Sequence, residues 1–465
     1  MRRGVWIAVL VAACASTSES EDGTADSSTG IADTGTESAT LTTSVSDTTP
    51  STSGDPTTMS SMSMTGSETE TETTPDTSET GPSGCVLSLE CTDADAPICE
   101  DEECVACTAA ADPDGACASK DASTPVCRDD GVCVQCTDGN PVACVDETPL
   151  CDGGSSSCIG CTYHEQCGSS ACRIATGACF EETEVYDVGS GQTYPSITAA
   201  VTDLGEGVQV VLVLHAGASF DQGVTLSGVD TAYAFMSEDV PAPQWVQTSE
   251  MRATLRVENA AEAYVQNVRL TLNGFTGAAA VQADGGRVYL DRAAVVANQG
   301  GGVALSNGAF GQVRNCFVSG NGNEAVASRG LNVTDSTLDL SYSTVVRNDA
   351  GTDDSLVCND GATVNVRNSV LVGRDSPSIT CVPLDATFSV FDEAVAGQGN
   401  ESVAMLDTGW FIDVFLNDFH LSGSGATQFA DVAQWQSGDP AVDIDGDDPR
   451  PNVDGTADVA GADVP

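Results

Sequence analysis

From about residue 185 onward, hydrophobic residues come in short β-branched runs that are separated by Gly and Asn. Five nine-residue segments of this region align without gaps at nearly regular intervals, and begin at Val265, Leu290, Val313, Leu340 and Val366. Their first and sixth positions are always Val or Leu, and the ninth is Asn in four of the five. This repeat predicts a parallel β-helix, because each coil would stack its inward residues on those of the next coil.

Asn recurs at two positions of this repeat. The third position carries Asn267, Asn315 and Asn368, and the ninth carries Asn273, Asn298, Asn321 and Asn348. Asn tolerates a left-handed backbone at a bend, and its side chain can hydrogen-bond to a neighbour along the stack. We therefore predict that these residues form turns and ladders, a structural role rather than a ligand-binding one.

Three cysteines lie within the repeats. Cys358 and Cys381 are separated by the same interval as the segment starts Leu290 and Val313, which is one coil. Residues stacked on adjacent coils lie roughly 5 Å apart, within the range of a disulfide, so we predict that these two are bridged. Cys316 has no partner at that spacing and is expected to be a small buried hydrophobic residue.

Another 16 cysteines crowd into residues 85–180, in four consecutive groups of four. Short units with little hydrophobic content need cross-links, so we predict eight disulfides whose connectivity the sequence leaves open. Zinc is the alternative, because three C-x-x-C pairs span the group boundaries. So many thiols favour an oxidising compartment over the cytosol. The pairs are Cys104/Cys107, Cys133/Cys136 and Cys158/Cys161.

The chain before Cys85 contains no hydrophobic periodicity after its start. Residues 15–84 are nearly all Ser, Thr, Asp, Glu, Gly and Pro, which predicts a disordered linker. Before it, Arg2 and Arg3 precede an apolar run of nine residues, too short to span a bilayer, that ends at Cys14. The segment Val-Ala-Ala-Cys resembles a bacterial lipobox, which implies cleavage before Cys14 and lipidation of its thiol. An ordinary secretory signal is the alternative.

The chain of 465 residues has 69 acidic and 16 basic residues, a net charge of −53. Nucleic acid and anionic lipid headgroups are therefore poor partners. Ala15 and Ser16 follow Cys14 in place of the Asp that often retains lipoproteins at the inner membrane. The lipobox resemblance therefore implies a location at the outer membrane or cell surface, with lipid as the only anchor.

Both ends of the repeat region carry a family resemblance. Residues 187–201 (DVGSGQTYPSITAAV) resemble the opening of the pectin-lyase-like β-helix family, with a strand, a Gly turn and a short capping helix. Residues 418–421 (DFHL), 439–451 and 461–463 (GAD) resemble its closing segment, which packs over the last coil in relatives. The resemblance implies an all-β, right-handed parallel β-helix over residues 184–430 and a closing segment over 431–465. The cysteine array before it resembles repeats in surface proteins of myxobacteria, where it serves as a spacer or interaction module. The β-helix fold carries lyases, hydrolases, epimerases, adhesins and inert spacers, so the resemblance does not settle activity.

Few charged residues offer chemistry in the repeats. The second repeat position carries Asp291, Arg314 and Arg367, and if it faces outward, the first two lie on adjacent coils. Lyases on this fold use a basic residue beside calcium, but the same pattern is typical of salt bridges on a solvated face. We therefore assign no catalytic residue and keep these three as weak candidates.

Near the C-terminus, Asp443, Asp445 and Asp447 follow a D-x-D-x-D spacing that could ligate Ca²⁺. No Glu follows at the twelfth position, as it would in an EF-hand, so a polar loop is the simpler interpretation. We predict no resident metal or cofactor, with calcium at these residues as a weak alternative.

The function predicted from these patterns is that of a non-catalytic surface lipoprotein whose β-helix binds extracellular polysaccharide or surface proteins. The alternative is a polysaccharide lyase or glycoside hydrolase. Few aromatic residues, 5% of the chain, argue against a typical hydrolase cleft.

Overall fold

The computed structural model describes residues 85–141, 144–215, 220–248, 251–322, 329–348, 355–374 and 378–465. Cys14, the predicted signal peptide and the predicted linker over 15–84 lie outside the described residues. Within the described ranges, no helix is long and apolar enough to cross a membrane.

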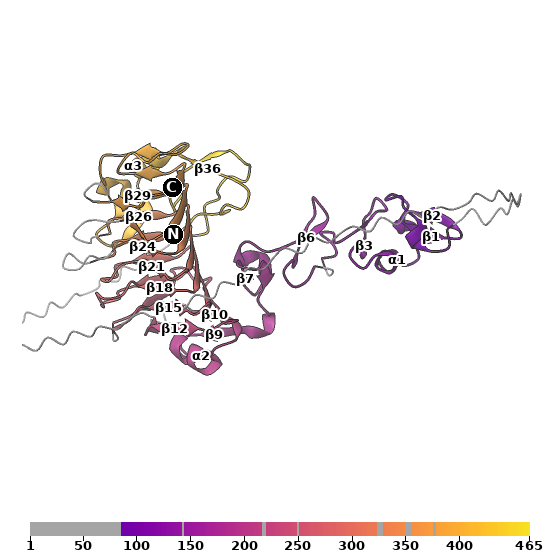
Figure 1. Cartoon of the computed structure of the whole chain (residues 1–465), viewed down its shortest axis with the longest axis horizontal. Coiled ribbons are helices and arrows are strands. Elements are labelled where there is room, and N and C mark those ends of the chain that lie inside the picture. Colours follow the sequence, from indigo (N-terminus) through magenta and orange to yellow (C-terminus); the bar gives the residue numbers. More distant parts are fainter. Residues whose placement is uncertain are drawn as a thin grey trace, which may run out of the picture. The chain divides into compact units, whose positions relative to one another are not determined.

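The predicted fold class is confirmed: a parallel β-helix follows a disulfide-rich region (Figure 1). Each coil from β10 to β30 contributes one strand to each of three parallel sheets, and β9, β31, β32 and β33 extend sheets 1 and 2. Sheet 1 contains β9 (Val185–Val188), β10 (Gln209–Leu214), β13 (Ala232–Met236), β16 (Glu262–Gln266), β19 (Arg287–Asp291), β22 (Phe310–Arg314), β25 (Thr337–Ser341), β28 (Thr363–Arg367) and β31 (Asp385–Thr387). Sheet 2 contains β11 (Phe220–Asp221), β14 (Gln244–Val246), β17 (Arg269–Thr271), β20 (Ala294–Val296), β23 (Phe317–Ser319), β26 (Thr344–Val346), β29 (Val370–Val372), β32 (Val390–Phe391) and β33 (Glu401–Ser402). Sheet 3 contains β12 (Val224–Ser227), β15 (Leu255–Glu258), β18 (Val281–Asp284), β21 (Val303–Ser306), β24 (Leu331–Thr334), β27 (Leu356–Asn359) and β30 (Ile379–Thr380).

The first and sixth repeat positions form the interior of the coil. All ten of these Val and Leu side chains are 2% exposed or less, in line with the inward stacking that the repeat predicts. Their strands pair in register, so Val265 lies beside Leu290, and Leu290 beside Val313. Helix α2 (Ile197–Leu204) begins after Ser196, whose hydroxyl accepts a hydrogen bond from Ala199 N–H, and it buries Ile197 against the interior. The predicted capping helix is therefore present.

The bend between sheets 1 and 2 requires a left-handed residue at the third repeat position. All five residues there have φ between +46° and +57°: Asn267, Arg292, Asn315, Tyr342 and Asn368. Arg292 and Tyr342 adopt this conformation without the low steric cost that Asn offers. The bend is thus imposed by the stack of neighbouring coils rather than by the local residue alone.

The ninth-position residues form the predicted ladder. Asn298 donates from Nδ2 to Asn321 Oδ1 over 3.0 Å, and Asn321 donates in the same way to Asn348 Oδ1 over 3.1 Å. All three side chains are buried. Because a buried amide is costly unless it is hydrogen-bonded, each of these residues depends on its neighbours in the stack.

A second ladder runs along the fourth repeat position, and Cys316 takes part in it. Backbone N–H groups donate to the hydroxyl on the next coil, from Cys316 to Ser343 over 3.2 Å and from Ser343 to Ser369 over 3.1 Å. Cys316 Sγ accepts from Ala293 N–H over 3.4 Å, so the thiol occupies the place that serine holds on later coils. Cys316 is free and buried, as expected, and burial raises the pKa of its thiol far above the usual range.

Because the thiol stands in for a hydroxyl, Cys316→Ser is expected to change the free energy of unfolding by less than about 1 kcal/mol. Cys316→Val has a similar size but leaves Ala293 N–H without its acceptor, and should cost about 1–3 kcal/mol. Urea unfolding of both variants measures the difference. Equal stability of the two variants would show that the sulfur is only a space-filling group.

The 16 cysteines of the array are all in disulfides, so the zinc alternative is wrong. Each group joins its first cysteine to its third and its second to its fourth, and the two members of every C-x-x-C pair belong to different groups. The bonds are Cys85–Cys99, Cys91–Cys104, Cys107–Cys127, Cys117–Cys133, Cys136–Cys151, Cys144–Cys158, Cys161–Cys172 and Cys167–Cys179.

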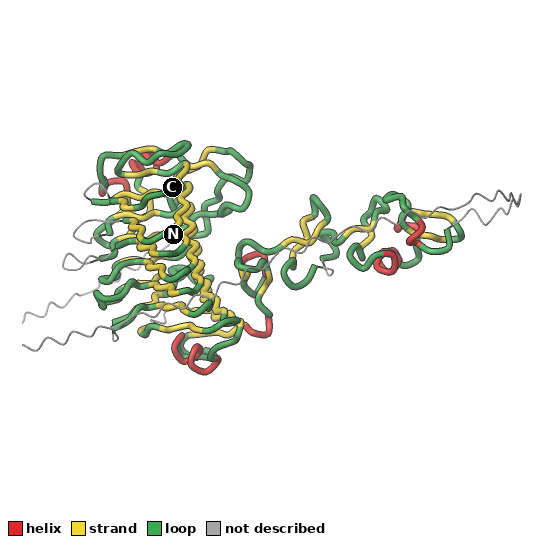
Figure 2. The backbone as a smooth tube through the Cα atoms, in the orientation of Figure 1, coloured by secondary structure: helices red, strands yellow, loops and turns green. Residues whose placement is uncertain are grey.

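Each group also contains a two-stranded antiparallel hairpin, which Figure 2 shows as short strands between loops. The hairpins pair β1 (Ile98–Glu100) with β2 (Glu103–Val105), β3 (Val126–Cys127) with β4 (Cys133–Val134), β5 (Leu150–Asp152) with β6 (Ser157–Ile159), and β7 (Cys172–Arg173) with β8 (Ala178–Cys179). The second group adds helix α1 (Pro113–Lys120). In the β-helix, Cys358 and Cys381 form a disulfide between adjacent coils, with their Cα atoms 4.5 Å apart.

The chain from Phe411 onward, which includes the predicted closing segment 431–465 and is called the closing segment from here on, packs along the side of the coil. It contains β34 (Phe411–Asp413), β35 (Asp418–Leu421), α3 (Gly423–Phe429), β36 (Ala433–Gln434) and β37 (Ala457–Asp458). Its side chains Phe419 and Phe429 pack with Phe317 and Val346 of sheet 2. Phe317 and Val346 occupy the fifth and seventh repeat positions, which flank the inward sixth position and point outward, so a second apolar core forms outside the coil.

Candidate functional site

The fourth cysteine group, residues 161–179, packs against the outer face of sheet 1. Phe180 and Ala171 share an apolar cluster with Tyr264 and Tyr289, and the Phe180 and Tyr264 rings meet edge to face at 5.7 Å. Arg173 Nη2 lies 3.0 Å from Glu262 Oε2 at the edge of this contact. We call residues 161–179 the docked repeat.

The docked repeat covers two of the residues that the sequence offered as weak catalytic candidates. Asp291 and Arg314 lie on adjacent strands of sheet 1, in register, and their side chains form an ion pair with Nη2 and Oδ2 3.0 Å apart. Each residue is only 6% exposed. Arg314 also donates from Nη1 to the carbonyl of Thr162 over 3.2 Å.

The interpretation of Asp291 and Arg314 as a solvated face is therefore wrong. They point away from the coil interior, but the docked repeat separates them from solvent. Burial by itself would raise the pKa of Asp291, yet the adjacent Arg314 guanidinium outweighs it and lowers that pKa. Both side chains are charged and form an ion pair with each other.

Arg367 lies two coils beyond Arg314 in the same register. It pairs with Asp439 of the closing segment, whose Oδ2 accepts from Nη1 over 2.7 Å. Arg367 is thus held in a separate contact and is not brought together with Asp291.

A groove lies between the docked repeat, the bends of the coil and the closing segment, and residues of all three parts line it. It consists of three adjoining cavities of about 470, 340 and 240 Å³, and Arg292 lines all three. We call it the lateral groove. Its charged lining residues are Glu165, Glu238, Arg269, Asp291, Arg292, Arg314, Asp418, His420 and Asp445.

Arg292 stands at the centre of the lateral groove because of its place at the left-handed bend. Its guanidinium pairs with Glu165 of the docked repeat. Glu165 Oε1 also accepts a hydrogen bond from Gln266 Nε2 over 2.7 Å, so this carboxylate joins two coils to the docked repeat. The sequence did not indicate that Glu165 and Arg292 form a pair, because the two residues lie far apart along the chain.

At the other end of the groove, His420 lies between two carboxylates. Its Nδ1 is 2.6 Å from Asp418 Oδ1, and its Nε2 is 3.0 Å from Asp445 Oδ2. The hydrogen bond to Asp445 is the main reason that the pKa of His420 rises to about 9, so the ring is a doubly protonated imidazolium at neutral pH. The sequence did not indicate the contact with Asp445, because no pattern in it shows that the two residues meet.

The predicted calcium ligands divide among different environments. The ligand atoms of Asp445, His420 and Asp463 lie within 4.8 Å of one another, a group that could hold a cation. Burial raises the pKa of Asp463 to about 6. Asp443 Oδ1 accepts from Gly446 N–H over 3.0 Å, and Asp447 is exposed. Both nitrogens of His420 already face carboxylates, those of Asp418 and Asp445. The positive charge beside these two carboxylates is therefore supplied by the imidazolium.

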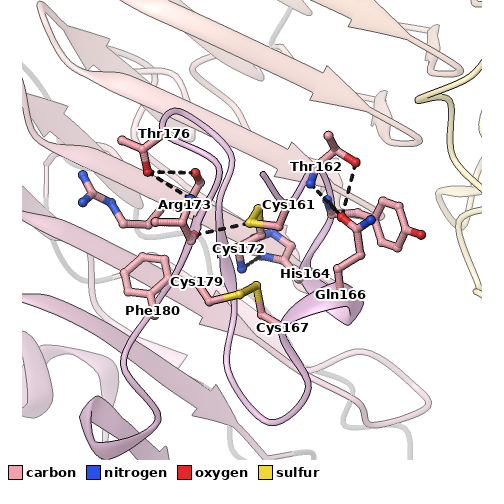
Figure 3. The surroundings of a disulfide bond; sticks show 12 residues. Cys161, Thr162, His164, Gln166, Cys167, Cys172, Arg173, Thr176, Cys179 and Phe180 are labelled. Atoms are coloured by element: carbon pink, nitrogen blue, oxygen red, sulfur yellow. Dashed lines mark hydrogen bonds between the residues drawn. A yellow bond between two sulfur atoms is a disulfide. The ribbon is translucent and has the colours of Figure 1, made fainter. Parts of the chain in front are cut away.

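His164, in the 3₁₀ helix His164–Cys167 of the docked repeat, lines the same groove. It is 2% exposed, and its Nδ1 accepts a hydrogen bond from Cys172 N–H over 3.1 Å (Figure 3). An acceptor at Nδ1 places the ring proton on Nε2, which has no hydrogen-bond partner among the described residues. Burial lowers the pKa of His164 to about 4, so the ring is neutral at physiological pH.

This depressed pKa predicts a loss of stability in acid. In the unfolded chain His164 titrates near 6.5, so between pH 6.5 and about 4 the unfolded state binds more protons than the folded state. The contribution of His164 is present above pH 6.5 and is lost as the pH falls toward 4. We expect wild type to lose more stability than His164→Asn between pH 7 and about pH 4.5, as measured by urea unfolding. Equal losses of stability in wild type and His164→Asn would show that the His164 ring is solvated or paired.

Comparison with known proteins covers only the N-terminal part of the chain. Residues 70–185 match the model of a family of unknown function (DUF8331), which spans the cysteine array and less than half of the sequence. No curated protein matches the chain, and no solved structure matches it.

Proposed function

We propose that this chain is an exported surface protein, held in the outer membrane by lipid at Cys14, whose β-helix binds extracellular glycan without chemically altering it. The observation that carries the proposal is the lateral groove. Its largest cavity has a volume in the usual range for ligand sites. Its lining combines paired hydrogen-bond donors and acceptors with apolar side chains. Anchoring and location rest on the sequence from Met1 to Cys14.

The charges of the groove support binding over turnover. Two of the three weak candidates for catalysis, Asp291 and Arg314, are buried and paired with each other, so neither is available to move a proton to or from a substrate. The third, Arg367, pairs with Asp439. A lyase or hydrolase would need them to exchange that partner for a ligand. Binding requires no such rearrangement.

The test uses the purified full chain and a panel of neutral and acidic polysaccharides, with and without calcium. Binding and product formation, followed by unsaturated uronate absorbance and new reducing ends, are read in the same wells. We expect binding without product. Product that disappears in an Asp291→Ala, Arg314→Ala double variant would establish the lyase or hydrolase alternative instead.

The position of the glycan-binding site is tested by substituting two arginines, one inside the lateral groove and one outside it. Arg269→Gln alters the floor of the largest cavity, where this guanidinium contacts the carbonyl of Asn417 over 3.4 Å. Arg256→Gln alters the outer face of sheet 3, where Arg256 pairs with Glu258 over 2.9 Å. Only the first should weaken glycan binding, by roughly threefold or more. Weakening by Arg256→Gln alone would move the site to sheet 3.

A further inference from the structure

We infer that the docked repeat is part of the ligand-binding site rather than a spacer, and that the lateral groove takes an extended, uncharged saccharide chain. This inference rests on the proposed function and names its ligand class. It assigns the cysteine array a direct role in ligand recognition. The array residues involved precede, by a long stretch of sequence, the coils that they contact.

Three structural parts line the groove. Val240 and Asn267 line both the largest cavity and the cavity beside the docked repeat, and Gly446 of the closing segment lines the latter and the third cavity. The docked repeat contributes His164 and Glu165 to the cavity beside it. The closing segment contributes Leu416 and His420 to the largest cavity. A site made of three cavities that share lining residues suits a linear chain better than a compact small molecule.

The charge pattern favours an uncharged ligand. Arg292 faces Glu165, Arg314 faces Asp291, and His420 faces both Asp418 and Asp445. With Glu238 and Arg269 included, the five carboxylates of the lining outnumber its four cations, and the chain as a whole carries a net charge of −53. A polyanion would be repelled at long range and would find no unpaired cationic cluster on arrival. Adjacent donors and acceptors instead match neighbouring hydroxyl groups, each of which donates and accepts.

His164 provides an independent sign that a ligand acceptor belongs in the groove. A neutral imidazole N–H that is buried without a partner is costly, and such groups are rare in native proteins. His164 lines the cavity, and its Nε2–H, itself buried, lacks a hydrogen-bond partner among the described residues. A sugar hydroxyl oxygen that reaches this atom from the cavity would satisfy it without any change in charge.

Exposed apolar side chains also line the largest cavity. Val240 and Leu416 do so while 86% and 76% exposed. Phe415, the chain neighbour of Leu416, is 74% exposed but lies outside that lining. Sugar rings present apolar C–H faces as well as hydroxyls, and apolar side chains such as Val240 and Leu416 pack against those faces.

The experiment titrates the full chain by calorimetry with neutral cello-, xylo-, manno- and malto-oligosaccharides of two and six units, and with hexagalacturonate as the acidic arm. We expect at least one neutral hexasaccharide to bind, and to bind at least about tenfold more tightly than its disaccharide, because the longer chain contacts more of the groove. Tighter binding of hexagalacturonate than of every neutral chain would overturn the charge argument.

The role of the docked repeat is tested with two substitutions at one position. His164→Asn keeps an acceptor near Nδ1 for Cys172 N–H and removes the Nε2 donor, whereas His164→Gln keeps a donor near Nε2. We expect His164→Asn to weaken the binding of the neutral hexasaccharide by roughly 3–10-fold, and His164→Gln to bind it with an affinity within about twofold of wild type. Unfolding midpoints of both variants confirm that each is folded.

The outcomes separate the two proposals. Glycan binding that His164→Asn leaves unchanged would overturn the role of the docked repeat while the proposed function stands. No binding to any saccharide, neutral or acidic, would overturn both and direct attention to a protein partner.

Discussion

Replacing Arg314 with alanine is expected to lower the free energy of unfolding of the β-helix by about 3–5 kcal/mol. The substitution leaves the Asp291 carboxylate ionised in an environment where it is 6% exposed, with its partner removed. It also leaves the Thr162 carbonyl without the guanidinium that joins it to sheet 1. Urea unfolding followed by circular dichroism measures the loss.

Two control variants show whether the cost comes from an uncompensated buried charge. Arg314→Met combined with Asp291→Leu removes both charges and should recover most of the stability, since replacing a buried pair by apolar residues is often neutral. Arg256→Ala breaks a partly exposed pair with Glu258 on sheet 3 and should cost less than about 1 kcal/mol. A loss in Arg314→Ala as small as that in Arg256→Ala would mean that water reaches the pair.

Replacing Asn321 with alanine is expected to cost about 3 kcal/mol or more, because it breaks the ladder at its centre. Asn321 donates from Nδ2 to Asn348 Oδ1 and to the Val295 carbonyl, over 3.1 and 2.8 Å. Its Oδ1 accepts from the backbone N–H of Asn298 over 3.1 Å and from that residue's Nδ2 over 3.0 Å. Alanine satisfies none of these buried groups.

The matched control for Asn321 is an exposed asparagine of the same β-helix. Asn359 donates to Asn332 Oδ1 over 3.4 Å at the surface, where water can replace the lost contact. Asn359→Ala should therefore change stability by less than about 0.5 kcal/mol. Comparable losses in both variants would show that the ladder contributes no more than a surface hydrogen bond.

Much of the coil was predictable because its constraints repeat. Val265 and Leu290 are buried for the same reason, and the spacing of Cys358 and Cys381 reflects the same period. The left-handed bend at Asn267 followed from the residue type, but that at Arg292 did not, since the stack imposes it on an unfavourable side chain.

The candidate site was predictable only in part. Asp291 and Arg314 were placed on adjacent coils, as the register indicated, yet their burial came from the docked repeat. The pairing of cysteines in the array stayed open because spacing alone permits many connectivities. The contact of His420 with Asp445 was not predictable, since nothing near His420 in the sequence shows that Asp445 approaches it.

The sequence by itself determined the repeating part of this protein. A nearly constant period, inward Val and Leu, and aligned Asn residues specify a stack, because each coil meets the same neighbours as the last. Only the tertiary structure decided the lateral groove, since it forms where the coil meets two other parts of the chain, the docked repeat and the closing segment. Glu165 finds Arg292, and Thr162 finds Arg314, across long stretches of intervening chain. Such contacts depend on the complementary shape and charge of surfaces distant in sequence, and no periodic pattern encodes them.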